Sequence, residues 1–385
     1  MTKPLRVGFL SSKNYYDKTA FSGALYYMFE SLSTQPITLI PLGHPQKPAS
    51  NSISHWLKKA RRKLQHQVSQ PSQPSEEISN FIDLAHRQLK DNPCDIIFAP
   101  VAKTEVSLIE TNTPILYLSD STQPLIQKNY GKFNKKKLIN QDYVKALEEE
   151  RCAISKSTKI IYSSQWAANS AIQDFGASAD KIHVIPFGTN LDSVPPKQSD
   201  FSRLLSPPYK LLFITGNWQR KGGDLVLEIL NLLNRSTEST SELIIIGEYP
   251  DSLPKDRRIK KVPFLDKNVK RQFRKYIEIL NESHLLLSPT RADCSPLVFG
   301  EANAYGIPVI TTAVGGIPEI IYPGKNGYML SVDAPAAEYV TLIQQIFSDQ
   351  KGYQDLVIAS RLEYENRLNW THWADKTFEV MSSFS

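Results

Sequence analysis

The sequence predicts an α/β protein built from two Rossmann-like parallel-sheet domains. Short apolar runs alternate along the chain with longer stretches of helical period, which is the pattern of parallel strands joined by helices. A chain of 385 residues is too long for one ordinary core and suits two domains of about 150 to 200 residues each. Near its middle, the segment "NLDSVPPKQSDFSRLLSPPYK" breaks both periodicities with prolines and polar residues. We therefore expect domains at 1–190 and 209–365, joined by a linker at 191–208.

The apolar runs define the expected strands of each half. The first half has candidates at 5–10, 37–42, 94–100, 114–119, 159–164 and 182–188. The second half has candidates at 209–215, 242–247, 259–265, 284–289 and 308–312. Helices are expected at 77–90, 141–155, 223–234, 267–281, 297–305 and 335–349. Because two such α/β units bind ligands at the carboxyl ends of their strands, functional side chains are expected to follow strands.

Composition limits the class of partner. The formal net charge of +6 suits anionic ligands or a membrane surface and is too small to indicate nucleic acid. The three cysteines, Cys94, Cys152 and Cys294, lack the spacing of a zinc or redox site, which favours a reducing cytoplasm. The first residues, "MTKPLRVGFLSS", do not resemble a signal peptide, and the apolar runs elsewhere are too short to cross a bilayer. We expect a cytoplasmic protein.

A basic loop follows the first strand of the second half. The segment "LLFITGNWQRKGGDLVLEIL" reads as strand, tight loop and helix. Gly216 and the pair Gly222–Gly223 allow the backbone to approach a ligand, and Arg220 and Lys221 add two positive charges. Such a site would stabilise the negative charge that grows on a departing diphosphate. The spacing is neither that of a P-loop nor GxGxxG, so an ordinary surface loop with solvated cations is the alternative.

A second helix start lies in the first half. In "FSGALYYMFESL", Ser22 is a candidate N-cap and Gly23 opens the helix. Its amide groups could face the same phosphate, although a plain helix start is the alternative.

Two acids accompany the stretch "SPTRADCSPLVFGEANAYGIPVITTAVGGIPEII" at 288–321. Asp293 falls in the loop after a strand, and Glu301 lies on the helix that begins near Pro296. A carboxylate accepts two hydrogen bonds side by side, which suits a vicinal diol of a ribose or a hexose. Two acids at the end of one strand could hold both ends of a nucleotide sugar. An acid that merely complements the helix dipole is the alternative for Glu301.

Taken together, these motifs resemble a known family. The segment "GNWQRKGG", the Asp293–x7–Glu301 pair and "GIPVITTAVGGIPEII" are similar to the retaining nucleotide-sugar glycosyltransferases of family 4 (glycosyltransferase group 1), whose hallmark is Glu–x7–Glu. The segments "FSGALYYM" and "SSQWAANSAIQDFGASADKIHVIPFGTNLD" extend the resemblance over nearly the whole chain. It implies the GT-B fold, with an acceptor-binding domain at 1–190, a donor domain at 209–365 and a ligand cleft between them. The last residues, 366–385, would form a helix that packs back on the first domain.

The resemblance also implies roles for the charged residues. Arg220 and Lys221 would bind the donor diphosphate, Glu301 the ribose hydroxyls and Asp293 the transferred sugar. Asp293 replaces the first glutamate of the family with a shorter acid, which places its reach to the sugar, and so the preferred hexose, in question. Further donor-binding positions implied by the resemblance are Gly23, Gly216, Phe264, Leu265, Leu297 and Val298.

A further departure concerns the first domain. Where the family often has a histidine after a strand, this chain reads "YLSDSTQPL", and Asp120 is the candidate for that place near the anomeric carbon. A simple cap at the end of the strand is the alternative.

The expected activity is transfer of a hexose from a UDP- or GDP-linked sugar to a hydroxyl acceptor such as a glycan, a lipid or a small metabolite. The resemblance implies retention of configuration, with no protein nucleophile. The stretch at 288–321 carries no Asp-x-Asp motif of the kind that binds a metal ion. Arg220 and Lys221 can take the place of a divalent ion at the diphosphate, so we expect no metal and no cofactor. A nucleotide-sugar epimerase and a non-catalytic sugar-nucleotide binder are the main alternatives. A hydride-transferring dinucleotide enzyme is a weaker one, since no GxGxxG turn follows the first strand.

A basic segment suggests a second partner. "SHWLKKARRKLQH" at 54–66 groups apolar residues near helical spacing among five cations, and "KFNKKK" at 132–137 adds further charge. As an amphipathic helix, 54–66 could rest on an anionic membrane and bring the enzyme to a lipid-linked acceptor. A solvated helix face is the alternative.

Overall fold

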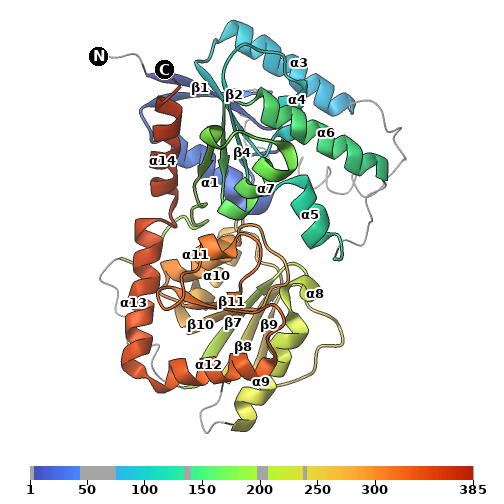
Figure 1. The fold of residues 1–385 in the computed structure, drawn as a ribbon. Helices are drawn as coiled ribbons and strands as arrows, with labels where there is room; N and C mark the ends of the chain where they lie inside the picture. Colours follow the sequence, from blue (N-terminus) through green and yellow to red (C-terminus); the bar gives the residue numbers. More distant parts are fainter. Residues whose placement is uncertain (1–3, 44–74, 134–139, 197–206, 237–240, 385) are drawn as a thin grey trace. The chain divides into compact units, whose positions relative to one another are not determined.

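The computed structural model describes residues 4–43, 75–133, 140–196, 207–236 and 241–384, and these form two parallel sheets (Figure 1). The strand order is β2-β1-β3-β4-β5-β6 in the first sheet and β12-β11-β10-β7-β8-β9 in the second. The predicted α/β class with two parallel sheets is confirmed. The expected helix at 54–66 and positions 134–137 of the basic run lie outside the described residues, as do positions 197–206 of the linker.

The first sheet follows the predicted strands closely. Its strands are β1 (Leu5–Leu10), β2 (Ile37–Leu42), β3 (Ile96–Pro100), β4 (Ile115–Ser119), β5 (Lys159–Tyr162) and β6 (Ile182–Val184). The helices that belong to this half of the sequence are α1 (Ala24–Leu32), α3 (Glu76–Asp91), α4 (Lys103–Leu108), α5 (Gln123–Tyr130), α6 (Asn140–Lys156) and α7 (Gln165–Phe175). Of these, α4, α5 and α7 were not among the expected helices.

The second sheet contains one strand that the sequence pattern did not indicate. Its strands are β7 (Tyr209–Thr215), β8 (Ser241–Gly247), β9 (Ile259–Val262), β10 (Leu285–Ser288), β11 (Val309–Thr312) and β12 (Gly327–Leu330). The edge strand β12 escaped prediction because it is four residues long and largely half-buried, so its apolar signal is weak.

The helices of the second half largely match the expectation. They are α8 (Trp218–Lys221), α9 (Gly223–Ser236), α10 (Lys270–Glu282), α11 (Leu297–Ala304), α12 (Ala336–Ser348), α13 (Gln350–Asn366) and α14 (Trp370–Ser382). The prediction that α10 begins at 267 is wrong. The Asp266 carboxylate accepts the Asn268 amide at 2.9 Å, and the Asp266 carbonyl accepts the Val269 amide at 3.0 Å, so the chain turns before the helix starts. Lys267 therefore lies in a loop.

The second sheet is covered on both faces, as its nearly continuous apolar strands require. Alternate residues of β7 point to opposite faces, so Leu211 and Phe213 pack with α9 and α12, while Leu212 packs with α10 and α11. From β7, the chain adds β8 and β9 on one side of the sheet and then β10, β11 and β12 on the other side. The direction in which strands are added therefore reverses between β7 and β10. In open α/β sheets, ligands bind beyond the carboxyl ends of the strands at such a reversal.

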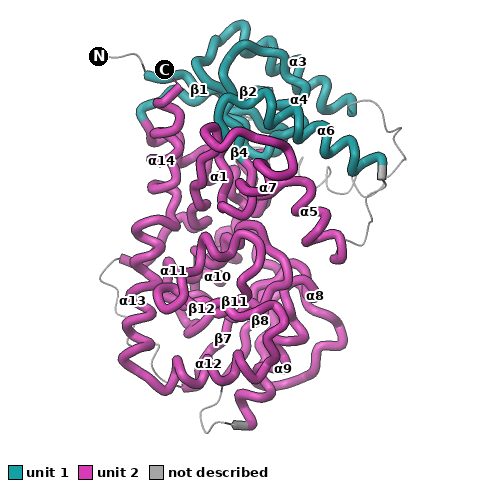
Figure 2. The backbone as a smooth tube through the Cα atoms, in the orientation of Figure 1, with its two compact units in different colours: residues 1–13, 36–118, 136–160 teal, residues 14–35, 119–135, 161–385 magenta. Residues whose placement is uncertain are grey.

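The chain divides into two compact units that are discontinuous in sequence (Figure 2). One comprises residues 1–13, 36–118 and 136–160, and the other 14–35, 119–135 and 161–385. The second unit therefore contains the second sheet together with α1, α5, α7 and β6 from the first half of the sequence. The domain boundaries predicted at 190 and 209 remain a prediction.

The C-terminal helix α14 returns to the first half of the sequence. It packs against α1, where the Trp370 ring stacks on Tyr27 with centroids 6.4 Å apart. Gln35 donates a hydrogen bond to Asp375 at 2.8 Å, and Trp373 is fully buried. Among the helices that the structure describes, none is both long and apolar enough to span a bilayer.

Candidate active site

A pocket of about 360 Å³ in the second compact unit lies at the carboxyl ends of β7 and β10. Its walls include the end of β7, the loop after β10 and the start of α11, and Lys18, Thr19 and Ser22 also line it. The pocket therefore occupies the reversal point of the sheet, which is where the strand order alone places a ligand.

The basic loop after β7 forms one wall of the pocket. Asn217 caps the single turn of α8 by accepting the Arg220 amide at 2.9 Å. Gly222 then adopts a left-handed conformation with φ of +76°, and a side chain there would overlap the Pro289 carbonyl. The glycine is therefore required by packing as well as by conformation. This turn places Arg220 and Lys221 beside the loop that follows β10.

Both cations meet Asp293, which lies 72 residues beyond Lys221 along the chain. The Lys221 ammonium donates a hydrogen bond to Asp293 Oδ2, and Arg220 Nη1 lies 3.5 Å from the same oxygen. Arg220 also donates to the Ala292 carbonyl at 2.6 Å, and its guanidinium carbon lies 5.1 Å from the centre of the Tyr130 ring. One acid thus faces two cations, which leaves a local excess of positive charge that suits an anion.

The paired glycines of the sequence support the Asp293 loop. A side chain at Gly315 would overlap the Asp293 carbonyl, and one at Gly316 would overlap the Cys294 carbonyl. The Gly316 amide donates to the Asp293 carbonyl at 3.2 Å. Only glycine allows the two backbones to approach this closely, so the pair helps to position the loop that carries Asp293.

Glu301 forms a second charged centre in the same pocket. Its side chain on α11 is 1% exposed, and Oε1 lies 2.5 Å from the Lys267 ammonium. The Tyr276 hydroxyl donates to Oε2. Burial, and then the nearby charge of Glu301, raise the pKa of Tyr276 well above its ordinary value, so the phenol remains a donor. The buried carboxylate therefore has both a cation and a neutral donor, as burial demands.

The other predicted donor-binding positions, Gly23 excepted, also line this pocket. Gly216, Leu265, Leu297 and Val298 line the pocket, and so does Phe264, whose side chain is 67% exposed. Leu297 and Val298 begin α11, so their amides have no acceptor within the helix.

The glycine loop before α1 differs from the prediction in one detail. Gly23, with φ of +90°, is the N-cap of α1, so the expectation that Ser22 caps the helix is wrong. Phe21 and Ser22 also have positive φ, which keeps Ser22 out of the extended conformation of a capping residue. Ser22 lines the pocket directly beside Gly23, where a side chain would lie 2.7 Å from the Lys18 carbonyl.

Two candidates, Gly23 and Asp120, are not among the residues that line the pocket, and Asp120 is the one with an assigned catalytic role. Asp120 directly follows β4. Burial, and then the charge of Asp120, raise the pKa of the Cys294 thiol, which places Asp120 near the loop that carries Asp293. Its role near the anomeric carbon stays a prediction.

Sequence reasoning missed several pocket residues, and those that bear on charge and hydrogen bonding are Lys18, Lys267 and Tyr276. Lys267 was assigned to a helix, and Tyr276 lies on the apolar face of α10 beside Ile279 and Leu280, so it read as core. With these included, the described lining residues comprise four cations, Lys18, Arg220, Lys221 and Lys267, and two acids. In the described part of the chain, no three His, Cys, Asp or Glu side chains are grouped as metal ligands would be.

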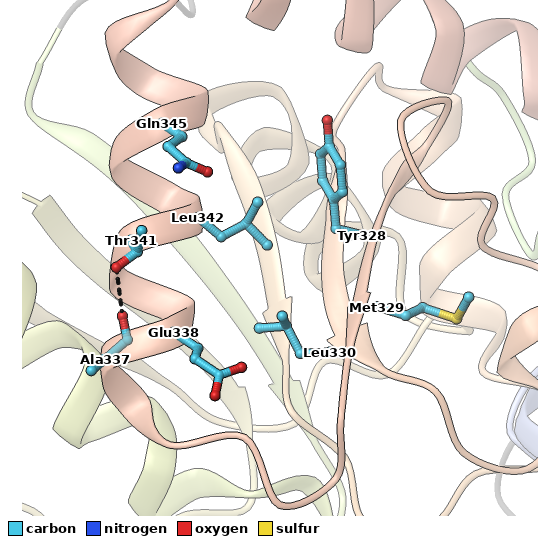
Figure 3. Close-up of a pocket in the computed structure, with 8 residues that line it drawn as sticks. All are labelled: Tyr328, Met329, Leu330, Ala337, Glu338, Thr341, Leu342 and Gln345. Carbon is cyan, nitrogen blue, oxygen red and sulfur yellow. Dashed lines mark hydrogen bonds between the residues drawn. The ribbon is translucent and has the colours of Figure 1, made fainter.

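A different hollow, between β12 and α12, offers a contrast (Figure 3). It is lined by Tyr328, Met329, Leu330, Ala337, Glu338, Thr341, Leu342 and Gln345. Its volume of about 450 Å³ is larger, but Glu338 is its only charged lining residue among those described. Volume alone therefore does not identify the candidate site, whereas charge and position at the sheet reversal do.

Comparison with known proteins agrees with this site. Residues 208–349, which contain both charged centres, match the family model of glycosyl transferases group 1. The chain is also 24% identical over 249 residues to a D-inositol 3-phosphate glycosyltransferase of Catenulispora acidiphila, a match that covers 61% of this chain and 59% of that protein. The chain thus spans less than two thirds of the length of the curated relatives that it matches.

Solved structures resemble the whole chain. Sucrose-phosphate synthase of Thermosynechococcus elongatus superposes with a TM-score of 0.70 at 16% identity, covering 99% of both chains. HepE of Anabaena, in complex with UDP and glucose, gives a TM-score of 0.66 at 14% identity, covering 98% of this chain and all of that chain. The chain therefore has the GT-B fold, as the resemblance predicted.

Proposed function

We propose that this protein is a glycosyltransferase that moves a hexose from a nucleotide diphosphate sugar to a hydroxyl acceptor, with retention of configuration. The match of residues 208–349 to the family model of glycosyl transferases group 1 supports this. The observation that carries the proposal is the pocket at the sheet reversal, which brings Asp293 with its two cations and Glu301 with its two donors into one enclosure.

The excess of cations supports a diphosphate as the bound group. Lys221 and Arg220 already share one carboxylate, so a diphosphate that enters the pocket would take over part of their hydrogen bonding without leaving Asp293 unpaired. As the bond to the sugar breaks, negative charge grows on the distal phosphate. Cations held in place before the reaction stabilise that charge with little reorganisation, and the first amides of α11 add donors on the same side.

The acids suit the hydroxyl-bearing ends of such a donor. Glu301 is held rigidly and keeps lone pairs that could accept a ribose diol. Asp293 lies beside the cations, where it could accept hydroxyl groups of the transferred sugar. Attack of the acceptor on the same face as the departing phosphate, which would take up the acceptor proton, accounts for retention without a protein nucleophile.

For the donor, we favour a uridine nucleotide as the first to test. HepE, which shares the fold, is described in complex with UDP, with UDP and glucose, and with UDP-glucose. Metal independence also belongs to this proposal, since two cations would take the place of a divalent ion. Activity that is unchanged in excess EDTA supports that part, and activity restored only by added Mg²⁺ or Mn²⁺ contradicts it.

A thermal-shift screen of UDP, GDP, ADP and their glucose or mannose conjugates tests donor binding. A ligand that binds only the native state raises the melting temperature, and UDP or GDP compounds are expected to do so. Incubation of the stabilising donor with candidate acceptors, followed by NMR of the product's anomeric proton, then tests transfer and retention. Free epimer formed without any acceptor would instead support a nucleotide-sugar epimerase, and binding without turnover would support a non-catalytic binder.

Peripheral membrane contact through residues 54–66 is a separate proposal. Sedimentation with phosphatidylglycerol vesicles, compared with phosphatidylcholine vesicles, tests it. Equal partitioning with the two lipids contradicts it.

A further inference from the structure

The carboxylate of Glu301 is linked through Lys267 to a segment far from α11 in sequence. The Lys267 ammonium lies 2.5 Å from Glu301 Oε1 and donates to the backbone carbonyl of Asn190 at 3.3 Å. An ammonium has three donors, and these two contacts fix its direction. Its nitrogen also lies 4.7 Å from the centre of the Tyr276 ring. Lys267 thus holds Glu301 and Asn190 at once.

Asn190 carries the connection to the glycine loop. It is fully buried, and its side-chain nitrogen donates to the Ser22 carbonyl at 2.7 Å. Its side-chain oxygen accepts the Trp370 indole at 3.0 Å, so both ends of the amide are engaged. Buried polar networks of this kind are rigid when every member has a partner.

The loop that Asn190 holds is conformationally costly. Phe21 and Ser22 have φ of +50° and +55°, a region that residues other than glycine seldom occupy. Such backbone persists only where the surroundings impose it, and it is concentrated at ligand sites. Ser22 lines the same pocket as Glu301 and Lys221. The Asn190 bond is therefore placed to maintain a backbone that faces the pocket.

We infer that Lys267 is a positioning residue that couples the ribose end of the donor pocket to its diphosphate end, through the chain Glu301–Lys267–Asn190–Ser22. The inference rests on the proposed function, because it takes the ligand to be a ribonucleoside diphosphate. Lys267 fixes the carboxylate that receives the ribose hydroxyls. Through Asn190, it also supports the loop expected under the diphosphate.

Binding measurements on Lys267→Met test this inference. Calorimetry would use UDP and 2′-deoxy-UDP, GDP and 2′-deoxy-GDP, and inorganic pyrophosphate. The wild-type protein is expected to prefer one ribonucleotide over its deoxy counterpart by about tenfold or more, the cost of losing a hydrogen bond to a charged group. Lys267→Met should reduce that preference to less than about threefold and also weaken pyrophosphate binding by several-fold.

Three further variants separate a positioning role of Lys267 from a general effect of removing a positive charge. Lys267→Arg keeps the charge and should restore part of the ribose preference. Asn190→Ala removes the bond to Ser22 but keeps the carbonyl that Lys267 contacts, so it should weaken pyrophosphate while preserving the ribose preference. Lys260→Met removes a cation that pairs with Glu282 at 3.3 Å outside the pocket, and it should change neither quantity.

The outcomes distinguish this inference from the proposed function. Wild-type protein that binds none of the nucleotides overturns both. Wild-type protein that binds UDP or GDP but does not favour ribose overturns the inference alone. The same holds if Lys267→Met lowers the melting temperature while the ribose preference and the pyrophosphate affinity stay at wild-type values, since Lys267 would then act only in stability.

Discussion

The two acids of the pocket differ in burial and in the kind of partner that each has. Asp293 lies in a loop, is 9% exposed and faces two cations through one oxygen. Glu301 lies on a helix, is 1% exposed and divides its two oxygens between a cation and a phenol. The first centre has spare positive charge that a ligand phosphate could use. The second is balanced and rigid, which suits recognition of a fixed set of hydroxyls.

This difference indicates how a single pocket can both bind and activate a donor. An ion pair with an excess cation can exchange partners at low cost, because no charge is left unpaired in the process. A nearly fully buried carboxylate with two donors cannot lose either of them cheaply. Substitutions should therefore affect catalysis most at the first centre, and affinity and stability most at the second.

The largest expected effect is that of Lys221→Ala at the first centre. Loss of a preorganised cation at the leaving group should lower kcat by about a thousandfold, as loss of a strong electrostatic contact does in other enzymes. Asp293 keeps Arg220 as a partner, so the melting temperature should change little. Lys376→Ala, which removes an exposed lysine paired with Glu379, is the matched control. Near-wild-type turnover of Lys221→Ala would remove the first centre from the mechanism.

Glu301→Gln should give the next largest effect, mainly in binding. The amide keeps the shape but loses the charge, so donor affinity should fall by about 10- to 100-fold, the value of hydrogen bonds to a charged acceptor. Lys267 would lose its acid, and the melting temperature should fall as well. Glu282→Gln, at a partly exposed acid paired with Lys210 and Lys260, controls for charge loss elsewhere. If Glu301→Gln lowers kcat while leaving the donor Kd unchanged, the contrast between the two centres is wrong.

Tyr130 tests how Arg220 is held. Tyr130→Leu removes the ring beside the guanidinium and should lower kcat by about fivefold, in line with a cation–π contact near 1 kcal/mol. Tyr130→Phe keeps the ring and should remain within about twofold of wild type. Steady-state kinetics with saturating donor provide the measurement. Equal losses for the two variants would assign the effect to the hydroxyl instead of the ring.

His284 should influence stability and leave activity unchanged, because it lies before β10, at the opposite end of that strand from the pocket loop. Burial, and then the nearby charge of Lys210, lower the pKa of His284 to about 4. The unfolded chain, with an ordinary pKa near 6.5, then binds more protons between pH 6.5 and 4, so stability falls as the pH falls through that window, by roughly 3 kcal/mol.

His284→Asn is the variant that checks this. In the wild-type protein, His284 Nδ1 accepts a hydrogen bond from the Lys210 amide at 3.0 Å. The asparagine side chain can accept the same bond, but it has no titratable group. Chemical denaturation at several pH values should show a smaller loss for the variant than for wild type. Parallel acid-dependent losses in the two proteins would show that other groups control this window.

Local sequence patterns were sufficient wherever neighbours along the chain decide the structure. The strands at 5–10, 37–42 and 209–215 were predicted to the residue, because each is a mainly apolar run bounded by polar positions or breakers. The weaker strand β12 and the start of α10 were not, since one is half-buried and the other depends on an Asp266 turn.

The sequence by itself determined the α/β class, the places of the charged loops after strands, and the residues Arg220, Lys221, Asp293 and Glu301 as candidates. Tertiary structure alone decided which charges meet. Asp293 pairs with Lys221, 72 residues away, and Glu301 pairs with Lys267, 34 residues away. Such pairings depend on the order of the strands in the sheet and on the turns that position each loop. The periods of two residues in a strand and 3.6 residues in a helix carry no information about them.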